Sequence, residues 1–293
     1  MKKVDIIGIQ MDLGASKRGV NMGPAAIRHA DIHDKLTSEG ITWRDKGDII
    51  PVMAGETSDR MKNFGQIVEA NTRLYHEVLD SLAEGSMPIV LGGDHSVAAG
   101  SIPAVLKHYG DIGVIWVDAH GDFNDDTSSE SGNMHGMPFS AVCGRGPARM
   151  VPFAESFVNP EKCVQIGARD VDRQERRRLR DAGVTVFSIT EVDKFGMPDV
   201  VRKAIEIASR DTAGIHISFD IDAVTPEQAP GVGTPVHSGL TVREAFLLME
   251  MLFDSKKTLS VDMVEVNPIL DEKNVTGNLA CELILSLMGK AVF

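Results

Sequence analysis

Short apolar runs alternate with helical segments along the chain, and this alternation constrains the fold more than any other feature. The strand-like runs lie at residues 4–9, 87–93, 112–118, 163–168, 184–189, 214–220 and 259–267, with a weaker candidate near 41–43. Segments with helical periodicity lie at residues 63–83, 96–107, 172–182, 198–209, 241–253 and 274–288. Nearly continuous apolar strands separated by helices predict an α/β fold whose mainly parallel sheet is covered on both faces.

Length and composition allow the chain to form one sizeable domain. It has 293 residues, 43% of them hydrophobic, and no repeat or linker divides it, so we expect a single domain over residues 1–293. The first apolar run is broken by Asp5, Gly8 and Gln10, which predicts a strand rather than a secretory signal. No run approaches the roughly 20 apolar residues that span a bilayer, so no membrane partner is expected.

The charge balance and the cysteines narrow the class of function. A formal net charge of −12 argues against a nucleic-acid partner, because a phosphate backbone needs a cationic face. Cys143, Cys163 and Cys281 show no metal-binding or disulfide spacing. They are interpreted as buried, reduced thiols, which are typical of a reducing compartment.

Polar side chains gather directly after three of the apolar runs. They are Asp94 and His95 after residues 87–93, Asp118, His120 and Asp122 at the end of 112–118, and Asp220 and Asp222 at the end of 214–220. In an open α/β sheet, sites form beyond the carboxyl ends of the strands. Residues at i, i+2 and i+4 of an extended chain point to one side, so these side chains are predicted to converge.

Two histidines and four carboxylates exceed what one ordinary metal ion requires. Four ionised carboxylates would repel one another, whereas two divalent cations balance their charge and favour a hydroxide between them. Oxygen-rich ligation with some imidazole favours Mn²⁺, with Co²⁺ or Ni²⁺ as possible substitutes. The alternative is that these aspartates only cap loops. The coincidence of several such triplets at strand ends favours the metal site.

At these positions the chain resembles the ureohydrolase family of arginases, agmatinases and formimidoglutamases, and bacterial-type arginases in particular. The matching segments are GGDHS at residues 92–96, DAHGDFN at 118–124 and SFDID at 218–222. Further similarity runs through KRGV at 17–20 and MGP at 22–24. The resemblance covers nearly the whole chain, and it implies a single arginase-like domain. The implied fold is a three-layer αβα sandwich around a mainly parallel, eight-stranded sheet.

The resemblance also implies which residues hold two Mn²⁺ ions in each chain. One ion is expected to bind His95, Asp118, Asp122 and Asp220. The other is expected to bind His120, Asp118, Asp220 and Asp222, so that Asp118 and Asp220 bridge the pair. Members of the family form homo-oligomers, usually trimers or hexamers, and a cytoplasmic location is expected.

The implied reaction is hydrolysis of the L-arginine guanidinium to L-ornithine and urea by a metal-bridging hydroxide. Glu265 matches the family glutamate that pairs with the guanidinium, and a carboxylate can accept two parallel N–H bonds. His135, in SGNMHG at residues 131–136, matches the residue assigned to proton transfer, for which imidazole is suited. Asp122 is expected to act in catalysis as well as to bind metal.

Further matches concern the amino-acid end of the substrate. The expected contacts are Asn124, Ser131 and Asn133 for the α-carboxylate, Asp172 and Glu175 for the α-amino group, and Thr234 near the guanidinium. Asp170 is a candidate just behind them. Agmatinases lack the SGNxHG segment, so L-arginine is the expected small-molecule substrate.

Three other functions stay open at this point. A related ureohydrolase would act on agmatine, formimidoglutamate or another guanidino acid. A metal-dependent deacetylase of the same fold would use one zinc ion and a catalytic tyrosine, but Tyr75 and Tyr109 lie in no site-like motif. A non-catalytic scaffold would have lost metal ligands, and none is lost here.

Overall fold

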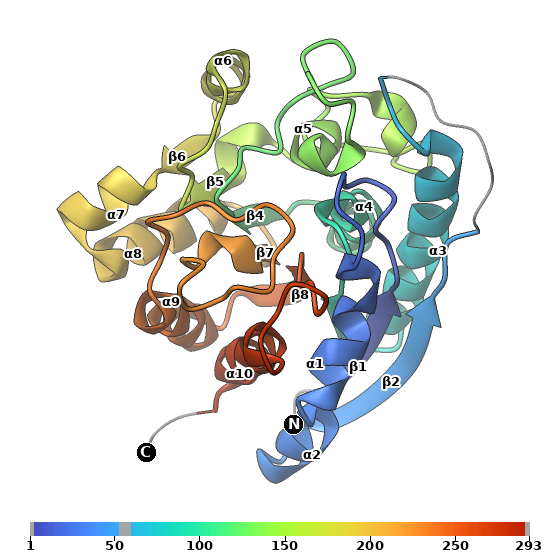
Figure 1. Ribbon diagram of the computed structural model, residues 1–293, viewed down its shortest axis with the longest axis vertical. Coiled ribbons are helices and arrows are strands. Elements are labelled where there is room, and N and C mark those ends of the chain that lie inside the picture. Colours follow the sequence, from blue (N-terminus) through green and yellow to red (C-terminus); the bar gives the residue numbers. More distant parts are fainter. Residues whose placement is uncertain (1–2, 53–59, 291–293) are drawn as a thin grey trace.

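One sheet of parallel strands runs through the protein. The computed structural model describes residues 3–52 and 60–290. The strands are β1 (Lys3–Ile9), β2 (Thr42–Ile49), β3 (Met87–Leu91), β4 (Gly113–Val117), β5 (Cys163–Ile166), β6 (Thr185–Phe187), β7 (Ile215–Asp220) and β8 (Thr258–Val264). Their order is β2-β1-β3-β8-β7-β4-β5-β6, and every neighbouring pair is parallel (Figure 1). The predicted eight-stranded sheet is confirmed.

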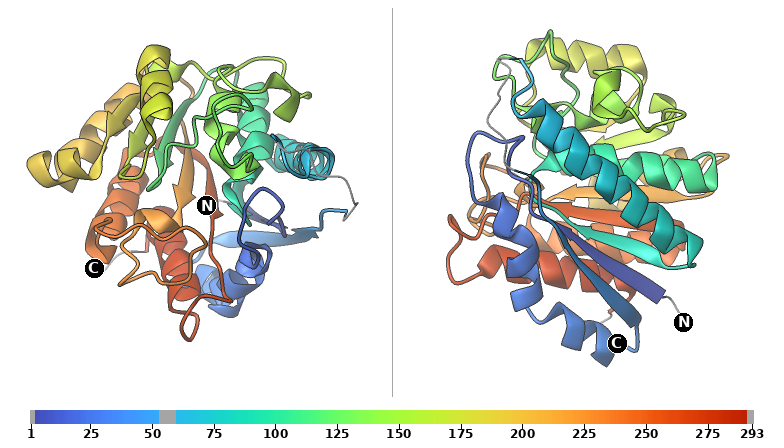
Figure 2. Two further views of the ribbon diagram at one scale, coloured as in Figure 1. Left: turned by 45° about the horizontal axis from the view of Figure 1, so that its top comes forward. Right: turned by 90° about the vertical axis from the view of Figure 1, so that its right-hand side faces the viewer.

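Helices cover both faces of this sheet, which completes the predicted three-layer sandwich (Figure 2). The helices of the described residues are α1 (Gly23–His29), α2 (Ile32–Ser38), α3 (Phe64–Ala83), α4 (Ala98–Tyr109), α5 (Pro138–Val142), α6 (Arg173–Ala182), α7 (Ile189–Phe195), α8 (Met197–Ala208), α9 (Val242–Ser255) and α10 (Val275–Met288). Within the described ranges, no helix is long and apolar enough to cross a membrane.

Two hydrophobic cores lie on opposite faces of the sheet. One packs the strands against α1, α2 and α7 to α10, and the other packs them against α3 to α6. Successive residues of β4 alternate between the cores, because side chains of a strand point to opposite faces. Ile115 and Val117 belong to the first core, and Val114 and Trp116 to the second. Cys143, Cys163 and Cys281 are buried and unpaired, as predicted.

The structure departs from the predicted elements in short and exposed segments. The weak candidate near residues 41–43 is the start of β2, an edge strand that extends to Ile49 and is mostly half-buried or exposed. The run predicted at residues 184–189 ends as a strand at Phe187, because Ser188 forms a capping box with Glu191 and begins α7. Helices α1, α2, α5 and α7 have only five to seven residues and were not predicted.

The candidate site lies at the carboxyl ends of four adjacent central strands, β3, β8, β7 and β4. Close packing there requires glycine at position 93, because a Cβ atom would lie 1.7 Å from the carbonyl oxygen of Met11. Asp122 and Glu265 have positive φ angles of 50° and 64°, a conformation that is uncommon outside glycine. Residues held in uncommon backbone conformations often cluster at functional sites.

Candidate metal centre and catalytic pocket

His95 lies at the centre of the first group of candidate metal ligands. It follows β3, and its Nδ1 atom lies 3.1 Å from Asp118 Oδ2, 3.1 Å from Asp122 Oδ2 and 3.3 Å from Asp220 Oδ2. All four side chains are buried. Nδ1 forms no hydrogen bond of normal geometry with any described residue. A buried imidazole nitrogen that faces three carboxylates without such a bond is suited to a metal ion.

A second group of candidate ligands surrounds His120 and shares one residue with the first. His120 Nδ1 lies 3.0 Å from Asp222 Oδ2 and 3.5 Å from Asp118 Oδ1. The potential ligand atoms of Asp118, His120 and Asp222 all lie within 4.8 Å of one another, as do those of His95, Asp118 and Asp122. Asp118 therefore stands between two places where an ion could bind, as its expected bridging role requires.

The carboxylates of this cluster also cap their own turns. Asp118 Oδ1 accepts a hydrogen bond from the His120 amide at 2.7 Å, and Asp220 Oδ1 accepts one from the Asp222 amide at 2.7 Å. In both residues Oδ2 faces His95 instead. Loop capping and metal ligation are thus compatible in the same side chain, and the first does not argue against the second.

Electrostatics at the cluster indicate an excess of negative charge. Burial, and then the charge of Asp118, raise the pKa of Asp122 to about 7. Burial and the charge of Asp222 raise the pKa of Asp220 well above its usual range. For Asp118, burial is outweighed by the nearby imidazoles of His120 and His95, which hold its pKa low. The two histidines therefore cannot neutralise every carboxylate, whereas divalent cations could. The donor set of carboxylate oxygens and imidazole nitrogens fits an ion of the Mn²⁺ type.

Glu265 and His135 form a pair beside the metal cluster. Glu265 follows β8, and its Oε1 atom lies 3.0 Å from His135 Nδ1 and accepts the His95 amide hydrogen at 2.9 Å. Burial lowers the pKa of His135, but the adjacent Glu265 outweighs this and raises it to about 9. In the absence of metal ions, His135 is therefore protonated at neutral pH and can donate a proton.

The cluster opens into a pocket of about 230 Å³. The residues that line it are His120, Asp122, Asn124, His135, Gly136, Asp170, Asp172, Glu175, Asp220 and Thr234. Five of these residues are acidic, so the pocket favours a cationic ligand. Among the expected substrate contacts, Ser131, Asn133 and Glu265 are not lining residues of this pocket. Ser131 is exposed, and the side-chain nitrogen Nδ2 of Asn133 donates a hydrogen bond to Ser16 Oγ at 2.6 Å.

Comparison with known proteins shows which family this chain belongs to. The profile of the arginase family matches residues 2–289. The chain belongs to the arginase family. It is 43% identical to the arginase of Bacillus subtilis over 99% of this chain and 98% of that protein. It is therefore a hydrolase that acts on the guanidino group of arginine.

Solved arginase structures share the whole fold. The arginase of Bacillus caldovelox matches with a TM-score of 0.96 and 42% identity, covering 100% of both chains. The arginase of Entamoeba histolytica, solved in complex with L-ornithine, matches with a TM-score of 0.92 and 31% identity, covering 99% of this chain and 100% of that one.

Two acidic residues at the start of α6, Asp172 and Glu175, line this pocket. Asp172 caps this helix, because its Oδ1 atom accepts the amide hydrogens of Gln174 and Glu175, both at 2.8 Å. Its Oδ2 atom accepts a hydrogen bond from the Asn124 side chain at 3.1 Å. Burial raises the pKa of Glu175 to about 8 despite a hydrogen bond from the Phe123 amide. Asn124, Asp172 and Glu175 thus lie together in the lining of this pocket.

Three residues that contact the candidate metal ligands were not singled out from the sequence. Trp116 donates its indole N–H to Asp118 Oδ2 at 2.9 Å, and Ser218 Oγ lies 2.9 Å from His95 Nε2. Each precedes an aspartate of the cluster by two residues, so the period of a strand could have revealed them. Arg169 donates to five backbone carbonyls, including that of Asp222 at 2.8 Å. No sequence pattern reports contacts of that kind.

Proposed function

We propose that this enzyme hydrolyses L-arginine to L-ornithine and urea with two Mn²⁺ ions. The observation that carries the proposal is the sharing of Asp118 between two groups of buried metal-ligand atoms at the floor of an acidic pocket. His95, Asp118, Asp122 and Asp220 would hold one ion. His120, Asp118, Asp220 and Asp222 would hold the other.

The ions, when bound, would supply a Lewis-acidic centre that lowers the pKa of a shared water and so provides a bridging hydroxide at neutral pH. The surrounding residues then have to orient a planar cation above this centre. Five acidic residues line the pocket and attract that cation. Asp122 would bind one of the metal ions and would also line the pocket below the guanidinium.

Glu265 is proposed to hold the guanidinium. Its contacts with His95 and His135 both use Oε1. The Oε2 atom is then the acceptor for a substrate N–H, and charge-assisted bonds to a carboxylate are strong and directional. Thr234 lines the same pocket, and its hydroxyl donates to Asp222 Oδ2 at 3.2 Å. Its own oxygen can accept a second guanidinium hydrogen.

His135 is proposed to move the proton that completes the reaction. It lines the pocket, and the adjacent Glu265 raises its pKa, which favours the protonated imidazolium. An imidazolium in this place can protonate the amine as it leaves, and the resulting neutral imidazole can accept a proton from the next water. Glu265 holds the Nδ1 side of the ring, so Nε2 is the atom that transfers the proton.

Recognition of an amino acid is proposed for the far end of the pocket. Asp172 supplies negative charge and Glu175 supplies a carboxyl oxygen for the α-amino group, with Asp170 behind them. Asn124, and Ser131 and Asn133 directly or through water, are proposed to meet the α-carboxylate. The Entamoeba histolytica relative was solved with L-ornithine, an α-amino acid, which supports this assignment.

Urea release from arginine and from agmatine, combined with metal analysis, tests this function. We expect two Mn²⁺ per chain and a kcat/KM for arginine that exceeds the value for agmatine by about 10²-fold or more, because agmatine leaves the polar contacts unpaired. Asp172→Asn should narrow this preference. Asp181→Asn, an exposed position on the same helix, should not.

Other outcomes of this test would overturn the proposal. Preference for agmatine, formimidoglutamate or another guanidino acid would indicate a different ureohydrolase. One zinc ion per chain with amide hydrolysis would indicate a deacetylase, but neither Tyr75 nor Tyr109 lines the pocket. Metal-loaded protein that hydrolyses none of these substrates would indicate a scaffold.

The assembly and location of the enzyme are also proposals. We propose that residues 1–293 act as one catalytic domain in a cytoplasmic homo-oligomer, either a trimer or a hexamer. The single sheet that runs through the described residues supports the first point. The family resemblance supports the others. Light scattering on the purified protein would measure the number of subunits.

A further inference from the structure

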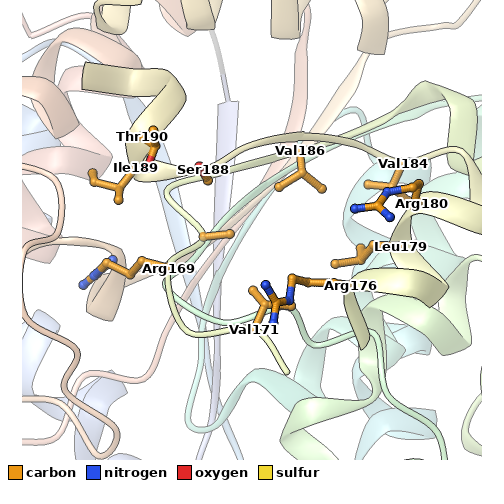
Figure 3. A pocket seen from close by; sticks show the side chains of 11 residues that line it. Arg169, Val171, Arg176, Leu179, Arg180, Val184, Val186, Ser188, Ile189 and Thr190 are labelled. Atoms are coloured by element: carbon orange, nitrogen blue, oxygen red, sulfur yellow. The ribbon is translucent and has the colours of Figure 1, made fainter. Parts of the chain in front are cut away.

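A second cavity lies beside the catalytic pocket, at the carboxyl ends of β5 and β6. Its volume is about 550 Å³, within the range of about 300–1,000 Å³ that is usual for small-molecule sites. It is lined by Ala168, Arg169, Val171, Arg176, Leu179, Arg180, Val184, Val186, Ser188, Ile189 and Thr190. Arg176, Leu179 and Arg180 reach it from α6, across from the segment that begins α7 (Figure 3).

The lining of this cavity is cationic and apolar. It contains three arginines and no aspartate or glutamate, although the chain has 42 acidic and 30 basic residues. Arg176 and Arg180 are four residues apart on α6, so their like charges lie side by side and repel. Leu179 and Val184 are buried beneath them, and Val186 is half-buried. A cationic rim thus surrounds an apolar floor.

The guanidinium groups of α6 in this cavity have no anionic partner. Within the part of the chain that the structure describes, neither Arg176 nor Arg180 forms an ion pair. Within the described residues, the only hydrogen bond of the Arg176 side chain joins its Nε atom to the carbonyl of Asp172, at 3.4 Å. Arg178, on the opposite face of the helix, is paired with Asp125 at 2.6 Å. The guanidinium groups of Arg176 and Arg180 are therefore available to an external anion.

We propose that this cavity binds a small organic oxyanion that has an apolar body. Guanidinium groups bind carboxylate and phosphate oxygens through paired N–H bonds, and the apolar floor accommodates the rest of the ligand. The catalytic pocket next to it selects for the opposite charge. The two sites therefore differ in ligand class, and the cavity is not an extension of the substrate site.

A short segment, residues 169–172, lies between the two sites and contributes side chains to both. Arg169 and Val171 line the cavity, whereas Asp170 and Asp172 line the catalytic pocket. The amides of Arg169 and Asp170 donate to the carbonyl of Ala119, at 2.8 and 3.0 Å, and Ala119 lies between Asp118 and His120. A ligand in the cavity would therefore shift the substrate-binding face of this segment. This consequence for catalysis rests on the proposed function, but binding itself does not.

Calorimetric titration of the metal-loaded enzyme with phenyl phosphate tests the site. We expect saturable binding of one molecule per chain to the wild type. Inorganic phosphate, which lacks the apolar body, and benzyl alcohol, which lacks the charge, should each bind at least about ten-fold more weakly. Equal affinity for either of these compounds, or no binding of phenyl phosphate at millimolar concentration, would overturn the proposal.

A pair of double variants with equal charge locates the bound molecule. Arg176→Gln with Arg180→Gln removes the two guanidinium groups of the cavity and should raise the dissociation constant of phenyl phosphate at least about ten-fold. Arg173→Gln with Arg177→Gln removes the same charge from α6, but these residues do not line the cavity, and the constant should change less than two-fold. Phenyl phosphate bound at the metal centre instead would bind both variants equally well and contradict the proposal. This readout needs no turnover, so it stands apart from the test of arginine hydrolysis.

Discussion

The indole N–H of Trp116 donates a hydrogen bond to Asp118 Oδ2 over 2.9 Å. The same indole stacks on the imidazole of His95, with ring centroids 4.0 Å apart and an interplanar angle of 11°. Phe139 stacks on its other face at 4.6 Å. One buried side chain therefore orients two candidate ligands, an anchoring role that usually tunes metal affinity.

Removing the indole N–H should weaken metal binding. Trp116→Phe keeps an aromatic ring against His95 but leaves Asp118 without this donor, so we expect about ten-fold weaker Mn²⁺ binding. With saturating Mn²⁺, most of the activity should return. Metal-binding titrations measure the effect, and Trp43→Phe, which changes the other tryptophan, is the control. Unchanged Mn²⁺ affinity would show that the hydrogen bond does not position Asp118.

Removing the shared carboxylate should empty both metal positions. Asp118→Ala takes away the residue that belongs to both ligand groups, so we expect loss of both ions and of activity. Elemental analysis after dialysis measures the metal content. Asp172→Ala, at a carboxylate outside both groups, should keep two ions per chain. Two ions retained in Asp118→Ala would reject the bridging role.

Neutralising Glu265 should separate substrate binding from metal binding. Glu265→Gln keeps the shape of the side chain but removes the charge that pairs with the guanidinium. We expect kcat/KM for arginine to fall by about 10²-fold or more while metal content stays at the wild-type value. Steady-state kinetics and elemental analysis check the two parts. Turnover like that of the wild type would mean that another group holds the guanidinium.

The pair of His135 and Glu265 should make stability depend on pH. The pKa of His135 rises from 6.5 to about 9 in the folded protein, so protonation favours the folded state. This contribution is fully present below about pH 6.5 and is lost as the pH rises through about 9. In metal-free protein, the difference in unfolding free energy between wild type and His135→Gln should shrink over this interval. Urea denaturation at several pH values measures it, and a difference that grows with pH would contradict the assignment.

Occupancy of the cationic cavity should alter substrate binding. The segment that separates the two sites carries Asp170 and Asp172 on its catalytic side, so we expect phenyl phosphate to change KM for arginine at least about two-fold, with a smaller effect on kcat. The effect should disappear when Arg176 and Arg180 are both changed to Gln. Kinetics at several phenyl phosphate concentrations check this. If phenyl phosphate changed KM equally in that double variant, it would be acting at the metal centre and not in the cavity.

Much of the fold could be predicted because several of its central strands are rich in apolar residues. β3 and β4 are apolar and buried at every position, so their hydrophobic runs mark them clearly, whereas β7 is equally buried but alternates apolar with polar residues. β2 lies at the edge of the sheet and has exposed polar residues, so only its start was recognised. The short helices span about two turns, which is too little for periodicity to show, and their ends depend on capping.

The candidate site could be predicted where residues stand near one another in the sequence. Asp118, His120 and Asp122 share one strand end, and their spacing alone implied convergence. The role of Arg169 could not be predicted, because it binds backbone carbonyls of segments more than 50 residues away. The positions of Ser131 and Asn133 depend on a loop whose path no local pattern specifies, and their substrate contacts stay a prediction.

The segment that separates the two pockets, residues 169–172, limits which insertions and deletions this protein can tolerate. Arg169 and Val171 face one ligand class, and Asp170 and Asp172 face the other. Inserting or deleting one residue here would exchange the two sets, placing a guanidinium in the arginine pocket and a carboxylate in its neighbour. Substitutions can accumulate on either side of this segment independently, but its length cannot change without reversing the polarity of both pockets at once.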